Sequence, residues 1–290
     1  MSGKLGAIDA QTHTAHQLDA VVTAMRGIAA ARSREAEARL PGIRASAATV
    51  GAAIGAVLPA ASERRSLAGV MPRSAAQTGN TMQIVIVLCT EQGFVGSLND
   101  QIVERAFHYR TQHAAEVMLI GMRGAMVAQE RGLALALSMA MASHVDDVAH
   151  LASQITDALY ERLEAAAVTN VALIHALPGE GTQIQIVEQR LMPFDFARFH
   201  LTRRQQPPLM NLPVERLLNG LVQAYIYVEL CEAIMLSFAA ENEARVQAML
   251  SARANLKDRL ASLTREYQQV RQDEITSDIV ELATGGIAQA

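Results

Sequence analysis

Two helical stretches at opposite ends of the chain most constrain what it can fold into. Near the C-terminus, apolar side chains recur at alternating steps of four and three: Leu256, Leu260, Leu263, Tyr267 and Val270. That spacing places them on one narrow stripe of a helix, and such a stripe needs a partner helix. The N-terminus keeps the same spacing at Leu18, Val22, Met25 and Ala29. Helices from opposite ends of a chain can pair only if the chain between them turns back. We therefore expect a long antiparallel coiled coil of these two helices, with a folded domain formed by the residues between them.

The residues between the two helices indicate an α/β domain. Met82 to Thr90 is a continuous apolar run rich in β-branched residues, which is typical of a strand buried on both faces of a parallel sheet. Further strands are expected at 117–121, 133–139, 171–177 and 183–187, with helices from Asn99, at 125–131 and at 146–166. This alternation predicts an open sheet of Rossmann type. A loop is expected at 64–80 and a linker at 203–208.

The fold class is therefore α/β, with a coiled coil of the two terminal helices and a central Rossmann-like domain. At 290 residues, the length prior is about two domains. We expect an N-terminal helix at 1–62, the α/β domain with its linkers at 63–209, and a C-terminal helix at 210–290.

Composition and motifs give no support for catalysis, a cofactor or a metal site. The net charge is −4, so no basic field would attract a phosphate backbone and we expect no nucleic-acid partner. Gly93 and Gly96 do not complete the G-x-G-x-x-G fingerprint, and no P-loop is present. His13 and His16 share a helix face but have no third ligand nearby in the sequence. We expect no catalytic residue, no cofactor and no metal ligand.

Signals for export or membrane insertion are weak. The long uncharged stretch from Ala45 to Ser62 is mostly Ala and Gly, too weakly apolar for the roughly 20 hydrophobic residues of a membrane helix. No signal peptide is apparent, so we expect no membrane insertion and a cytoplasmic location. Cys89 and Cys231 lie in apolar or helical segments, which indicates core thiols in a reducing compartment.

Several motifs, taken in order along the chain, resemble one known family. They lie at residues 23–32 (TAMRGIAAAR), 90–99 (TEQGFVGSLN), 121–132 (GMRG through Gly132), 239–249 (AAENEARVQAM) and 271–276 (RQDEIT), closing at Gly285 and Gly286. Their order and spacing resemble those of the γ subunit of rotary F-type ATP synthases along nearly the full length. Thr23, Glu91 and Gln92, together with residues 253–255 (RAN), depart from the family pattern, which suggests a divergent or alternate-type branch.

This resemblance implies a central rotor stalk without catalytic activity of its own. Its partners would be the α and β subunits of the F1 ring, the ε subunit and the c-ring, and it would lie peripherally on the cytoplasmic face of the bacterial inner membrane. Met25 matches a residue that meets a loop of β. Three polar residues match contacts with loops of the ring: Arg271, Gln272 and Thr276. Three others match a turn that would contact ε or the c-ring: Gly93, Gly96 and Asn99.

Two other functions remain open from the residues alone. The first is a nucleotide-binding α/β enzyme whose terminal helices serve oligomerisation. The second is a free-standing coiled-coil adaptor. Nucleotide binding to the isolated chain would favour the first, and the absence of α and β subunits from a native pull-down would favour the second over a rotor.

Overall fold

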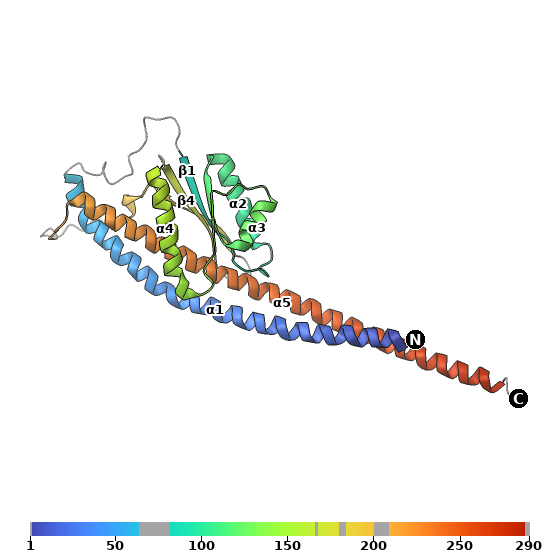
Figure 1. Cartoon of the computed structure of the whole chain (residues 1–290). Helices are drawn as coiled ribbons and strands as arrows, with labels where there is room; N and C mark the ends of the chain where they lie inside the picture. Colours follow the sequence, from blue (N-terminus) through green and yellow to red (C-terminus); the bar gives the residue numbers. More distant parts are fainter. Residues whose placement is uncertain (1, 64–81, 166–167, 180–183, 200–208, 288–290) are drawn as a thin grey trace. The chain divides into compact units, whose positions relative to one another are not determined.

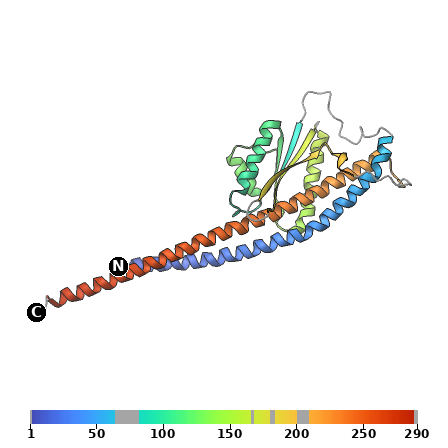
Figure 2. The ribbon, with the colours of Figure 1, turned by 180° about the vertical axis from the view of Figure 1, so that it is seen from behind.

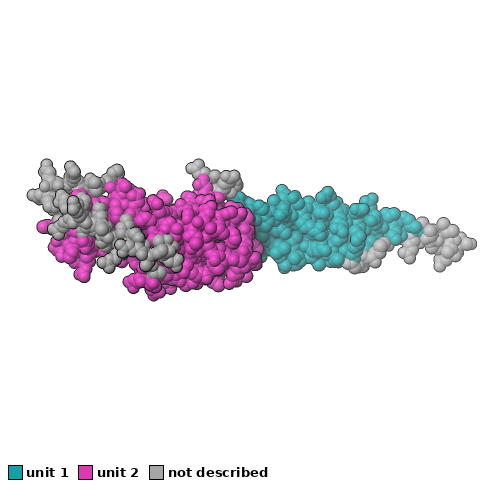
Figure 3. Space-filling model, turned by 90° about the horizontal axis from the view of Figure 1, so that it is seen from above, with its two compact units in different colours: residues 1–29, 246–290 teal, residues 30–245 magenta. Residues whose placement is uncertain are grey.

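The computed structural model describes residues 2–63, 82–165, 168–179, 184–199 and 209–287. The loop expected at 64–80 and the linker expected at 203–208 lie outside the described residues. The chain divides into two compact units, one of residues 1–29 with 246–290 and one of residues 30–245 (Figure 3). The expected division into residues 1–62, 63–209 and 210–290 stays a prediction. Each of the two compact units contains part of both long helices.

Unit 2 contains the open sheet that the sequence predicted. Its strands are β1 (Met82–Leu88), β2 (Glu116–Ile120), β3 (Leu137–Met139), β4 (Val168–Leu177) and β5 (Gln185–Met192). They lie in the order β3-β2-β1-β4-β5, with β1 to β4 parallel and β5 antiparallel to β4 at the edge. The Rossmann-type sheet is thus confirmed. Strand β3 is shorter than expected, and β5 runs further than expected.

Helices cover both faces of this sheet (Figures 1 and 2). One face packs against α2 (Leu98–His113) and α3 (Met122–Glu130), and the other against α4 (Val148–Ala165). Because successive side chains of a strand point to opposite faces, β1 supplies both cores: Ile84, Ile86 and Leu88 lie in one, Val85 and Val87 in the other. All five are fully buried, which explains the unbroken apolar run in the sequence.

Two long helices complete the chain, α1 (Ser2–Glu63) and α5 (Val214–Ile287). Within unit 2, both contribute to the core on the α4 face: α1 through Ile54 and Val57, and α5 through Leu218, Ile226 and Ile234. These apolar side chains of α1 and α5 are therefore buried in the core of unit 2.

By length and composition alone, two helices are apolar enough to cross a membrane. Each of α1 and α5 contains an 18-residue window with a mean hydropathy of 1.4. The window in α5 is 61% buried within the protein, as expected for a core helix. The expectation of no membrane insertion stays a prediction.

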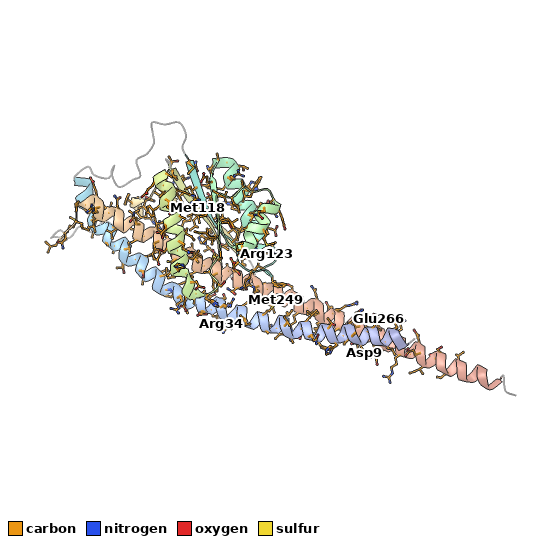
Figure 4. All side chains as sticks on the ribbon, in the orientation of Figure 1. Asp9, Arg34, Met118, Arg123, Met249 and Glu266 are labelled. Atoms are coloured by element: carbon orange, nitrogen blue, oxygen red, sulfur yellow. The ribbon has the colours of Figure 1, made fainter. Side chains whose placement is uncertain are left out.

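Unit 1 is an antiparallel helix pair. The N-terminal part of α1 lies beside the C-terminal part of α5 in both views, and Asp9 and Glu266 mark the two helices in Figure 4. Arg259 Nη2 donates to Gln11 Oε1 at 3.1 Å, and Arg253 Nε pairs with Asp19 Oδ1 at 3.2 Å. Residue numbers rise along one helix as they fall along the other, so the predicted antiparallel coiled coil is confirmed.

The observed seam between the two helices differs from the expected N-terminal stripe at Leu18, where Asp19 takes the seam position. The C-terminal stripe is as predicted, with Leu263 only 1% exposed. On α1, however, Leu18 is 48% exposed, and its neighbour Asp19 is the less exposed of the two. The alternating repeat of three and four along α1 runs through Leu5, Ile8, Thr12, Ala15, Asp19, Val22, Arg26 and Ala29, none of which is exposed. Asp19 can hold a seam position because Arg253 neutralises it.

Replacing Leu263 with Ala tests this seam. Removing a buried leucine side chain and leaving a cavity costs about 2–5 kcal/mol of local stability. Amide hydrogen exchange should therefore quicken on both helices of unit 1. Leu250→Ala on the same helix is the matched control, because Leu250 is 41% exposed and should change exchange little. Equal effects of the two variants would contradict the assigned seam.

Candidate functional site at the carboxyl end of the sheet

The turn after β1 adopts an unusual backbone conformation. Phe94 has φ 61° and Gly96 φ 60°, so the backbone turns through the left-handed region twice. Phe94 is a bulky residue there, which is a strained conformation that the surrounding contacts must hold. Its side chain is exposed.

Two glycines let α3 approach the end of β1. Gly121 has φ 114°, and a Cβ there would lie 2.6 Å from the backbone oxygen of Cys89. A Cβ on Gly124 would collide with the Cys89 side chain. This close contact gives a physical reason for Gly121 and Gly124 of the motif at 121–132. Burial raises the pKa of the Cys89 thiol, which therefore stays protonated in the core.

A buried charged pair on α5 lies against this turn. Arg245 Nη2 donates to Glu241 Oε1 at 2.6 Å, and both side chains are only 6% exposed. The backbone N–H groups of Glu91 and Gln92 donate to the two carboxylate oxygens of Glu241, at 3.2 and 3.4 Å. Arg245 Nε donates to Gly93 O at 3.3 Å. We call these two side chains and the turn residues they bond the α5 node.

The node surrounds the buried Glu241 carboxyl group with hydrogen-bond donors. Burial raises the pKa of the Glu241 carboxyl group, and the hydrogen bonds from Arg245, Glu91 and Gln92 oppose that rise. Arg245 Nη1 also donates to Asn242 Oδ1 at 3.1 Å. The charges are thus compensated within the protein, as buried ions require.

A second layer of hydrogen bonds ties the turn to the neighbouring elements. Glu91 Oε2 accepts from the backbone N–H groups of Met122 at 3.1 Å and Met141 at 2.7 Å. Asn99 Oδ1 accepts from Thr90 N at 3.0 Å, and Asn99 Nδ2 donates to Thr90 Oγ1 at 2.8 Å. The turn therefore links β1, α2, α3 and α5.

Among the residues expected to contact ε or the c-ring, Asn99 differs from the two glycines. Asn99 is 4% exposed and both atoms of its amide are bonded to Thr90, so its side chain orders the turn from inside. The contact expected at Asn99 stays a prediction. Gly93 is half-buried in the node and Gly96 is exposed, and their contact role stays a prediction.

The residues expected to contact the ring of α and β subunits all lie in unit 1. Met25 is half-buried on α1. Arg271, Gln272 and Thr276 are exposed on α5. The C-terminal end of this helix continues past the N-terminal end of α1 (Figures 1 and 2). Thr276 Oγ1 donates to Gln272 O at 2.8 Å, which leaves the Gln272 amide group outside that bond. Arg271, Gln272 and Thr276 therefore lie close together on α5, whereas Met25 lies on α1.

Sequence reasoning assigned no role to Glu241 and Arg245. Both belong to the motif at 239–249, but a Glu and an Arg four residues apart are also typical of a solvated helix face. The flanking Phe238, Ala239, Ala240 and Ala244 were the available signal, because they make this stretch apolar on every side.

Replacing Glu241 with Gln tests the node. The change keeps the side chain's shape but leaves Arg245 buried without a counter-charge, which costs about 3–5 kcal/mol. Chemical denaturation of unit 2 should shift accordingly. Asp100→Asn, which breaks the exposed pair with Arg131, is the control and should cost about 1 kcal/mol or less. A Glu241→Gln effect no larger than the control would refute a structural role for the buried pair.

Comparisons with known proteins agree along nearly the whole chain. A family model described as ATP synthase matches residues 4–288. The ATP synthase gamma chain of Solibacter usitatus is 25% identical, covering 92% of this chain and 93% of that protein. The gamma chain of Parafrankia sp. is 26% identical, covering 100% of this chain and 99% of its own length.

Solved structures share the fold at low identity. A chain of the Euglena gracilis mitochondrial ATP synthase matches with TM-score 0.64 and 12% identity, covering 100% of this chain and 95% of that one. A chain of the Tetrahymena thermophila mitochondrial ATP synthase central stalk and c-ring matches with TM-score 0.55 and 19% identity, covering 80% and 99%. The chain belongs to the ATP synthase family and, within it, to the γ subunits that form the central rotor stalk of F-type ATP synthases.

Proposed function

We propose that this γ subunit turns inside a ring of α and β subunits and has no catalytic site of its own. In that role it couples ion passage through the membrane sector to ATP synthesis or hydrolysis at β. Its further partners would be ε and the c-ring. The complex would lie on the cytoplasmic face of the bacterial inner membrane, with γ held there peripherally and without insertion.

One observation supports the proposed contact with the ring of α and β subunits. Arg271, Gln272 and Thr276 are exposed, and the C-terminal end of α5 continues past the N-terminal end of α1 (Figure 1). Because their side chains are exposed, these polar groups are available to loops of surrounding subunits. Met25 on α1 would supply a second, apolar contact with β.

The α5 node supports the absence of nucleotide chemistry in γ. In open α/β sheets, ligands bind beyond the carboxyl ends of the strands, where the strand order reverses. Here β1 lies between β2 and β4 at that point, and Glu241 and Arg245 fill the space above its end. The turn that a phosphate would occupy in such sheets is bonded to α5 instead. Gly93, Gly96 and the exposed Phe94 of this turn would face ε or the c-ring.

The double variant Arg271→Ala with Gln272→Ala tests the ring contact. It removes charge-assisted hydrogen bonds worth about 1.5–3 kcal/mol each, so turnover should fall about tenfold or more while the seam stays intact. ATP hydrolysis and subunit stoichiometry are measured on the reconstituted complex. Arg265→Ala with Gln269→Ala removes the same residue types from exposed positions on the paired part of α5 and should leave turnover unchanged. Normal turnover in a correctly assembled Arg271/Gln272 variant would reject the contact.

A separate measurement addresses the nucleotide-binding alternative. Titrating the isolated chain with ATP or NAD should give no heat of binding, because the end of β1 is filled by the α5 node. Micromolar binding would favour an α/β enzyme with oligomerisation arms over a rotor. In native cells, a pull-down with this chain should recover α and β subunits, and their absence would favour the adaptor alternative.

A further inference from the structure

The N-terminal part of α1 carries a second apolar stripe, which the seam of unit 1 does not use. Leu18, Val21 and Ile28 are 48%, 54% and 56% exposed, and Met25 between them is half-buried. Their steps of three, four and three are those of a coiled-coil stripe, and each of the four precedes a seam residue by one position. A stripe with this spacing fits a further helix that lies alongside α1.

The surface around this stripe is uncharged. Between Gln17 and Ile28 the charged residues are Asp19 and Arg26, and both occupy seam positions. In the same unit, α5 instead exposes a dense set of charges, among them Lys257, Asp258, Arg259, Arg265 and Glu266. Exposed apolar patches that interrupt a charged surface mark protein interaction sites. A second copy of the chain would meet no like charge along this stripe, which makes self-association possible here.

The stripe is complementary to itself when two copies lie antiparallel. Its spacing is symmetric about residue 23, so a two-fold axis there places Leu18 opposite Ile28 of the second copy and Val21 opposite Met25. Each contact then occurs twice, once from each copy. The stripe is flanked by small residues, over which the large side chains of the other helix can pack: Ala20, Ala24 and Gly27.

We propose that the free chain forms a homodimer in which the exposed stripes of two copies pack antiparallel along α1. Burial of the large apolar side chains drives the association. Because the same surface serves both copies, the two-fold contact closes and no third copy adds. The stripe spans only about three helical turns, so we expect a dissociation constant of about 1–100 µM.

This inference concerns the free chain and does not rest on the proposed rotor role. Since Met25 belongs to the stripe, a chain paired in this way could not make the contact with β proposed above. The dimer is thus a form of the unassembled subunit, in which this apolar surface is removed from water.

Sedimentation equilibrium of the full chain, from about 1 to 300 µM, should show monomers and dimers without larger species. Val21→Glu and Ile28→Glu should each raise the dissociation constant about tenfold or more, because each brings two carboxylates into an apolar contact. Ile279→Glu is the control, since it adds the same charge at a 60% exposed apolar residue of α5 outside the stripe, and it should leave the constant unchanged. Circular dichroism checks that each variant keeps its fold.

Crosslinking tests the antiparallel register. Chains with Leu18→Cys and chains with Ile28→Cys are treated with a short bismaleimide, separately and as a mixture. The native Cys89 and Cys231 are buried and do not compete. The mixture should give covalent dimers and each variant by itself few, because two copies of residue 18 would lie about 15 Å apart along the helices.

Three results would overturn the proposal. The first is a monomer at every concentration. The second is an unchanged dissociation constant in both Val21→Glu and Ile28→Glu, which would mean that the copies meet through another surface. The third is crosslinking of either cysteine variant by itself as efficient as that of the mixture, which would indicate a parallel pair.

Discussion

The buried pair of Glu241 and Arg245 fixes how α5 lies against the sheet of unit 2. Its carboxylate and guanidinium groups find all their partners only in one position of the helix, where the backbone of residues 91–93 meets them. A slip of α5 by one residue or one turn would keep the Glu241–Arg245 bond, because both residues lie on this helix, but it would break their hydrogen bonds to the backbone of residues 91–93 and leave those polar groups without partners. Apolar contacts explain why α5 packs on this face of the sheet, and the α5 node fixes the register in which it packs.

That register has a mechanical meaning for a rotor. A helix held only by apolar side chains can rotate slightly about its axis at low cost, since neighbouring packings differ little. A helix held by charged hydrogen bonds to a strained turn cannot. The α5 node therefore ties α5 to the turn after β1 in unit 2, and through Glu91 this turn is bonded to Met122 of α3 and to Met141, which follows β3.

Much of the fold followed from the amino-acid pattern, and the exceptions have physical causes. The apolar run of β1 predicted a doubly covered strand, and the four-three repeat of α5 predicted the seam at Leu263. The N-terminal seam was wrong at Leu18 because apolar spacing alone favours a leucine over its neighbour Asp19. Asp19 holds the seam position through Arg253, more than two hundred residues away, a partner that no local pattern reveals. The node was missed for the same reason, since burial of Glu241 and Arg245 depends on a turn far away in sequence. The hydrogen bonds between the Asn99 amide and Thr90 likewise depend on the folded turn, so no local pattern predicts them.

The unpaired end of α5 also has an elastic consequence. Within unit 1, α1 lies beside α5 as far as its own N-terminal end, and the described part of α5 beyond that end has no second helix beside it (Figures 1 and 2). Two packed helices resist bending and twisting more than one, so stiffness falls at this point along the same continuous element. A load applied at the C-terminal end of α5 would first deform the single helix and reach the paired part afterwards. The tip would then act as a soft spring in series with a stiffer rod, storing part of each rotational step before passing it on.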